Sequence, residues 1–215
     1  MAGFSREEAV DRLESLLERI ETTEPPVPVR EVWTFGDLAL GLDPIDRLDV
    51  YLTKDILDEP DRAPALDAHY GVSGIGRTVR ASWAEAHPDA IRANESGHVA
   101  PERCLATHLV KPAEPIHLEI CNAFFEDNVT QRLAGAEATG NFTQLLDPRG
   151  VCLWIDGVRS EDAVTALREG SLAMPTLARS LELLGLEPAV ADRAATEYRD
   201  WLADQAGRTV RSDVG

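Results

Sequence analysis

The chain has 215 residues, long enough for one domain with an appended subdomain, and 44% of them are hydrophobic, which is enough to build a core. It holds no run of about 18 apolar residues, so a membrane-spanning helix is not expected. The formal net charge is −17 and no basic stripe is visible, so general binding of nucleic acid is not expected either.

The acidic charge is combined with an unusual choice of basic residue. Only Lys54 and Lys111 are lysines, and every other member of the 21 basic residues is an arginine. An excess of acids with almost no lysine is similar to the composition of proteins from halophilic archaea, whose cytosol holds molar KCl. At molar salt the Debye length is about 3 Å, so the mutual repulsion of the acids is screened. We therefore expect a halophilic protein.

The cysteines and the N-terminus both indicate a cytoplasmic protein. The three cysteines are an odd and sparse set without a disulfide framework, which favours reduced thiols. The first twenty residues carry charge throughout and lack the apolar centre of a signal peptide.

Residues 5–22 are predicted to form an amphipathic helix. Ser5 and Glu8 have the spacing of a capping box, and apolar residues recur at helical spacing after them. The proline-rich segment that follows is expected to be a short extended connector, because a proline disfavours helix in the residue before it.

Strands and helices then alternate up to about residue 159. The predicted strands are 31–35, 48–53, 115–122 and 151–155, and the predicted helices between them are 76–86 and 126–138. Residues 101–110 are compatible with a helix or a strand, and the pattern favours a helix. Helices alone follow: one from Ser160 to Gly170, one that ends at Gly185 and one that begins at Pro188. This order predicts an α/β or α+β fold, in which a mixed sheet forms the core and the C-terminal part is mostly helical. The expected divisions are 1–28 (helix and connector), 29–159 (core), 160–207 (helical part) and 208–215 (frayed tail).

The stretch 30–55 resembles the active-site element of the nucleotidyltransferase superfamily with the polymerase-beta-like fold. In that family a strand ends in a glycine turn, a second strand carries two metal-binding aspartates, and a third carboxylate lies on a later strand. Here Gly36 stands in the turn, Asp49 falls on the second aspartate, and Glu119 is available as the third carboxylate. The resemblance implies that Asp49 and Glu119 bind a divalent metal such as Mg²⁺ and that Gly36 lies beside a phosphate.

Two departures weaken the motif. Arg47 stands where the first metal-binding aspartate belongs, and Asp37 replaces the serine of the turn. A guanidinium cannot bind Mg²⁺. The alternative interpretation is a strand–turn–strand in which Asp46 and Asp49 are polar residues at a strand edge and Arg47 pairs with one of them.

A second candidate for anion binding is the glycine-rich segment 71–80. Gly74 and Gly76 lead into a predicted helix N-terminus, where free N–H groups favour negative charge, and Arg77 and Arg80 supply guanidinium groups for a phosphate. The segment matches neither a Walker loop nor the dinucleotide-binding fingerprint, and the alternative is an ordinary turn before a helix.

A zinc site is the third candidate. Its ligands would be Cys104 and His108, four apart on a predicted helix, with His117 and Cys121 on one face of a predicted strand. The spacings match no usual zinc motif, and the alternative is that the cysteines belong to the core.

Three stretches, DRLDVYLTKD (46–55), HLEICNAFFEDNV (117–129) and LLDPRG (145–150), resemble a family of haloarchaeal conserved hypothetical proteins without assigned function. That resemblance brings no catalytic residue with it. The sequence therefore favours a protein that binds a nucleotide or another phosphorylated small molecule on a degenerate nucleotidyltransferase-like core, without catalysis. The alternatives are an interaction protein that binds a partner through its C-terminal helices, and a zinc protein.

Overall fold

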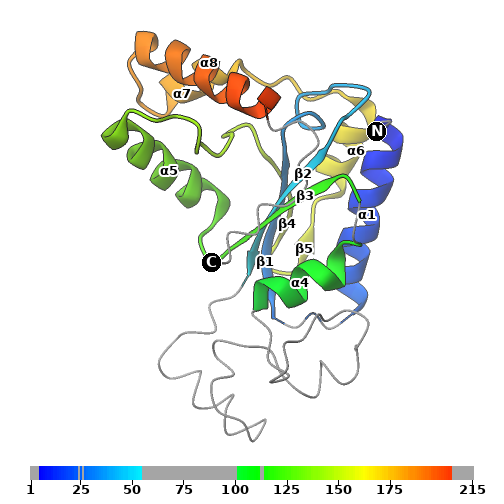
Figure 1. The fold of residues 1–215 in the computed structure, drawn as a ribbon. Helices are drawn as coiled ribbons and strands as arrows, with labels where there is room; N and C mark the ends of the chain where they lie inside the picture. The colour runs from blue at the N-terminus through cyan, green and yellow to red at the C-terminus, as the bar shows by residue number, and fades with distance from the viewer. Residues whose placement is uncertain (1–4, 24, 26, 55–100, 112–113, 205–215) are drawn as a thin grey trace, which may run out of the picture.

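A computed structural model describes residues 5–23, 25, 27–54, 101–111 and 114–204, with the side chains of 101–104 excepted. Within these residues the fold is α+β with a mixed sheet and a mostly helical C-terminal part, as predicted, and the sheet of five strands has helices on both faces (Figure 1). The strands are β1 (Val29–Phe35), β2 (Leu48–Lys54), β3 (Ile116–Cys121), β4 (Val151–Ile155) and β5 (Val158–Arg159). The helices are α1 (Arg6–Thr22), α4 (Pro101–Leu109), α5 (Phe125–Thr139), α6 (Glu161–Glu169), α7 (Leu177–Leu183) and α8 (Pro188–Asp204).

The strand order is β3-β2-β1-β4-β5. Strand β1 is antiparallel to both β2 and β4, whereas β3 is parallel to β2. The end of β1 therefore lies beside the beginnings of β2, β3 and β4. The turn after β1 and the segments that lead into these three strands meet at this one end of the sheet, although they are distant in the sequence.

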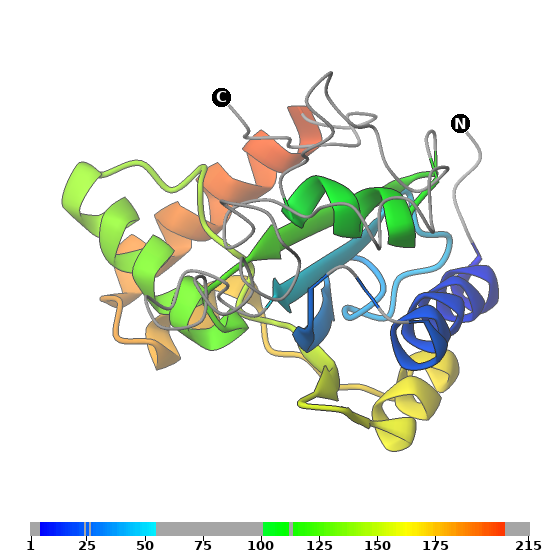
Figure 2. The same cartoon turned by 90° about the horizontal axis from the view of Figure 1, so that it is seen from below.

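One face of the sheet is covered by α1, α4 and α6 (Figures 1 and 2), and we call it the first face. Ser5 and Glu8 form the predicted capping box at the start of α1. The buried stripe of α1 is also the predicted one and consists of Ala9, Val10, Leu13, Leu16, Leu17 and Ile20. It packs in one cluster with Leu48, Val50 and Leu52 of β2. This cluster is the main apolar core, since burying each such side chain contributes about 1.5–3 kcal/mol.

The opposite face, which we call the second face, is covered by α5, α7 and α8. Trp33 of β1 stacks on Phe125 of α5, with ring centroids 4.6 Å apart, and Tyr51 of β2 meets Phe125 edge-on at 5.3 Å. Further out, the end of α5 packs with α7 and α8 in a separate apolar cluster around Phe142 and Leu181. Helix α6 packs instead with α1 and β4 on the first face.

The start of α5 is held by a residue from the sheet. Phe124, at the N-cap position, offers no side-chain hydrogen bond. The buried Glu31 of β1 accepts a hydrogen bond from the backbone N–H of Phe125 at 3.0 Å and another from the Thr53 hydroxyl at 3.2 Å. A carboxylate at this position also favours the positive end of the helix dipole.

The remaining predictions about local structure are confirmed where they can be compared. Helix α6 is capped by Ser160 and ends at Gly170, and α8 begins at Pro188. The predicted helix 76–86 lies outside the described residues. Among the described helices, none combines the length and apolar character needed to cross a membrane.

Candidate functional site

Asp49 is the central residue of the candidate site. Strand alternation turns Asp49, Tyr51 and Thr53 toward the second face, while Leu48, Val50 and Leu52 enter the first-face core. Strand β2 lies between β1 and β3, so Asp49 is not at a strand edge, and only 6% of it is exposed. This corrects the interpretation of Asp49 as a polar strand-edge residue.

The Asp49 carboxylate is paired but not fully satisfied. Arg47 Nη2 lies 2.6 Å from Asp49 Oδ1, which confirms the predicted pairing of Arg47 with an aspartate. The contact lies outside hydrogen-bonding geometry, and Oδ1 is a buried oxygen without a hydrogen-bond partner. Burial raises the pKa of Asp49 to about 6, and the nearby charges of Arg47 and His117 offset this only in part.

Gly36 closes the turn against this carboxylate. Its φ is +68°, which L side chains rarely adopt. A Cβ at this position would lie 2.5 Å from Asp49 Oδ2, so the contact also requires glycine. Asp37, the next residue, is partly buried, and this burial raises the pKa of its carboxyl group. The glycine turn and the acid predicted from the sequence are thus in direct contact.

Strand β3 brings His117 and Glu119 to the same face. His117 is the cross-strand partner of Asp49, and its Nε2 donates to Glu119 Oε1 at 3.2 Å. Arg132 of α5 donates from Nη2 to Glu119 Oε2 at 2.6 Å. Burial alone would raise the pKa of Glu119, but the bonds from His117 and Arg132 outweigh it and lower the pKa to about 2. Two carboxyl groups on one face therefore have pKa values shifted in opposite directions, a pattern typical of functional sites.

Asn128 links the Arg132–Glu119 ion pair to the core of the second face by hydrogen bonds. Its side-chain amide accepts from Arg132 Nε at 3.2 Å and donates to the Tyr51 hydroxyl at 2.9 Å. The Tyr51 hydroxyl in turn donates to the carbonyl of Ala123 at 2.8 Å. Each member has a partner, so the network fixes Arg132 and through it the position of Glu119.

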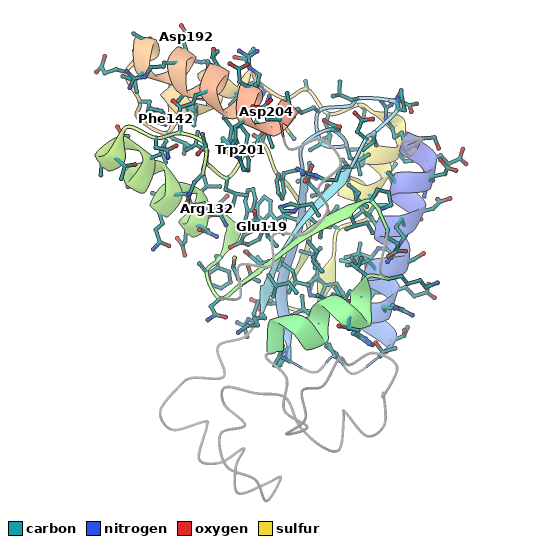
Figure 3. All side chains as sticks on the ribbon, in the orientation of Figure 1. Glu119, Arg132, Phe142, Asp192, Trp201 and Asp204 are labelled. Atoms are coloured by element: carbon teal, nitrogen blue, oxygen red, sulfur yellow. The ribbon has the colours of Figure 1, made fainter. Side chains whose placement is uncertain are left out.

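Helix α8 and the segment before β4 enclose the cluster. Tyr198 of α8 is buried, and its pKa is raised by burial and by the charges of Asp147, Asp49 and Glu119. Asp147 accepts from Arg149 Nη2 at 2.6 Å and is itself buried. Figure 3 shows Glu119 of β3 and Arg132 of α5 in the space between the sheet and α8.

Sequence patterns did not identify Arg132, Tyr198 or Asp147 as members of this cluster. Arg132 and Tyr198 stand in helices of ordinary amphipathic pattern, and Asp147 stands in a segment with the composition of a turn. A turn and two helices far apart in the sequence give no local signal that they meet. Only the pairing of β2 with β3 and the packing of α5 and α8 bring them together.

The other predicted sites are the anion site in segment 71–80 and the zinc site. Gly74, Gly76, Arg77 and Arg80 lie outside the described residues, and so does the side chain of Cys104. His108 belongs to α4 and contacts the Thr23 hydroxyl at 2.7 Å on the first face.

His117 and Cys121 lie on the second face, so the sheet separates them from His108. Within the described part of the chain, no group of three or more His, Cys, Asp or Glu residues is arranged to hold a metal ion.

These features define an α+β protein with a buried network of acid–arginine pairs at one end of its sheet. Residues 5–215 match the model of a family of unknown function, DUF7095, and the chain belongs to that family. Comparison with curated proteins found no match, and comparison with solved structures found none.

Proposed function

We propose that the protein binds a nucleotide or another phosphorylated small molecule beside Gly36, Asp49 and His117, and that it does not catalyse nucleotidyl transfer. The order of elements supports this proposal. A strand ends in a glycine turn, the next strand begins with a buried acid, and a parallel neighbour carries a further acid. This is the layout that the resemblance to the nucleotidyltransferase superfamily implies.

The observation that carries the proposal is the buried Asp49 carboxylate, whose Oδ1 is ion-paired with Arg47 but has no hydrogen bond of good geometry. A buried carboxylate destabilises the folded state when its ion pair and hydrogen bonds do not fully replace the lost water, and the raised pKa of Asp49 shows this cost. The apolar contacts of the first face do not need this acid, because its side chain points to the other side of the sheet. A bound ligand that completes the coordination of Oδ1 would offset the cost.

The chemistry of the neighbours suggests how such a ligand is held. Mg²⁺ is commonly bound by one or two carboxylates together with substrate phosphates, so a nucleotide could bring Mg²⁺ to Asp49. The Arg47 guanidinium, beside the same carboxylate, suits a phosphate oxygen.

The same neighbours argue against catalysis. Glu119 is already bound by His117 and Arg132, and Arg47 takes the place of the other acid. Of the two acids that the resemblance assigns to metal, only Asp49 then remains for a cation, and one carboxylate is too few for a two-metal mechanism.

The test is calorimetry with ATP, GTP and CTP, each with Mg²⁺, in molar KCl. We expect heat of binding from the native chain and its loss in Asp49→Asn. Asp46→Asn is the matched control, because Asp46 is an exposed acid just before β2, and this variant should bind as the native chain does. Absence of both heat and a thermal shift with all three nucleotides would contradict the proposal.

The alternatives have less support. Leu183 and Leu184 at the end of α7 are 67% and 44% exposed, but two adjacent leucines do not define a partner for the C-terminal helices. A zinc site of His108, His117 and both cysteines would need ligands from opposite faces of the sheet.

A further inference from the structure

An aromatic pair on α8 lies beside the charged cluster. Tyr198 and Trp201 are stacked, with ring centroids 6.0 Å apart and planes 28° apart. Tyr198 is buried, whereas Trp201 is half-buried. Tyr198 therefore lies on the inner side of the pair, and Trp201 lies closer to the protein surface.

Two observations place Trp201 near the proposed ligand. Tyr198 is buried, and the charges of Asp147, Asp49 and Glu119 all raise its pKa, so its side chain lies within electrostatic range of the proposed site. Trp201 follows one helical turn later, and Figure 3 shows it on the side of α8 that faces Glu119 and Arg132.

Trp201 also packs against the apolar cluster that contains Leu133, the neighbour of Arg132 on α5. The indole is thus held on one side by Tyr198 and by this cluster, and it is only partly covered.

We infer that Trp201 provides the stacking surface for the heterocyclic base of the ligand, so that the site takes a nucleotide in preference to a simple polyphosphate. This inference rests on the proposed function, and it adds the class of ligand and the residue that selects it. Every nucleobase has a π face that stacks on an aromatic ring, and an indole is the largest such surface in a protein. The charged groups near Gly36 would hold the phosphate end, and Trp201 the opposite end.

The test compares Mg²⁺–ATP with Mg²⁺–tripolyphosphate on the native chain and on two variants, by calorimetry in molar KCl. Trp201→Leu keeps an apolar side chain against Tyr198 but removes the π face. Trp201→Phe keeps an aromatic ring and serves as the matched control. We expect the native chain to bind ATP about 10-fold or more tightly than tripolyphosphate. Trp201→Leu should bring ATP down to the level of tripolyphosphate and leave tripolyphosphate unchanged, while Trp201→Phe keeps most of the preference.

The outcomes separate this inference from the proposed function. Equal binding of ATP and tripolyphosphate by the native chain would overturn the role of Trp201 and leave phosphate binding intact. An equal loss for both ligands in Trp201→Leu would overturn it as well, because that pattern indicates a structural role. Binding of neither ligand would overturn both proposals.

A second measurement does not depend on the folding of the leucine variant. Nuclear Overhauser contacts between the Trp201 indole and the H2 or H8 proton of bound adenine are expected in the native chain. The indole signal is assigned by its disappearance in Trp201→Phe. A native complex with bound ATP and no such contacts would overturn the inference.

Discussion

The two faces of the sheet are built from the same strands but hold different chemistry. On the first face, β2 and β3 contribute Leu48, Val50, Leu52 and Ile116 to one apolar core. On the second face, the alternate positions of the same strands are Asp49, His117, Glu119 and Cys121. The ion pair of Arg12 with Glu114 on the first-face side is partly exposed, whereas Asp49 lies underneath the second-face cover.

The two faces are expected to contribute differently to the stability of the fold. Burial of apolar side chains stabilises the fold, but a buried acid destabilises it unless the acid is fully paired. The apolar core of the first face does not include the second-face acids. If Asp49 serves binding, as we propose, substitution of Asp49 and substitution of a first-face leucine should change stability in opposite directions.

The largest effect is expected from the first face. Leu52→Ala removes a fully buried side chain from the main core and should lower the free energy of unfolding by about 2–5 kcal/mol. Chemical denaturation in molar KCl measures this change. A loss below about 1 kcal/mol would show that the first face does not carry the stability of the fold.

Gly36→Ala tests the contact between the turn and Asp49. The residue combines φ +68° with a Cβ position 2.5 Å from Asp49 Oδ2, so we expect a loss of about 2–4 kcal/mol. Gly140→Ala is the matched control, since Gly140 has φ +66° and no atom within 4 Å of the added Cβ. The control should lose only about 1–2 kcal/mol, the cost of the backbone conformation alone. Equal losses in the two variants would mean that the Asp49 contact has no effect on stability.

Asp49→Asn should stabilise the protein while it abolishes ligand binding. Burial raises the pKa of Asp49 from its ordinary value of 3.8 to about 6 in the folded state, so above pH 6 the acid is ionised in both states and the folded state is destabilised. Below about pH 4 the acid is protonated in both states and this cost disappears.

The variant should therefore gain about 1–3 kcal/mol at pH 7.5 and lose that gain between pH 6 and pH 4. Thermal unfolding at several pH values measures it. A destabilised variant at pH 7.5 would show that Asp49 is a structural residue.

The smallest effect is expected at the rim of the first face. Burial would raise the pKa of Glu114, but hydrogen bonds from Arg12 and from the Lys111 backbone outweigh it, so the folded pKa is lowered. A lowered carboxyl pKa gives stability that is present above the unfolded pKa and is lost as the pH falls through the folded value.

Glu114→Gln should therefore cost under about 1 kcal/mol at neutral pH and nothing in strong acid. A pH series of denaturation curves compares it with the native chain. A cost that persists in strong acid would mean that the side chain acts by packing and not by charge.

The elements of the fold could be predicted because their signals are local. The Ser5–Glu8 box fixes the start of α1, and the alternation from Leu48 to Thr53 fixes which residues of β2 face the same way. Gly36 and Asp49 could also be predicted as neighbours, since an antiparallel pair joined by a turn brings its two ends together.

The sequence by itself determined the class of fold, the faces of the strands and the pairing of Arg47 with an acid, because each depends on residues close together in the chain. Tertiary structure decided the rest of the site. Glu31 reaches the start of α5 across a sequence separation of 94, and the charge of Asp49 acts on Tyr198 only because α8 covers the second face. Periodicity shows that a residue faces inward, but it does not show which element it will face there.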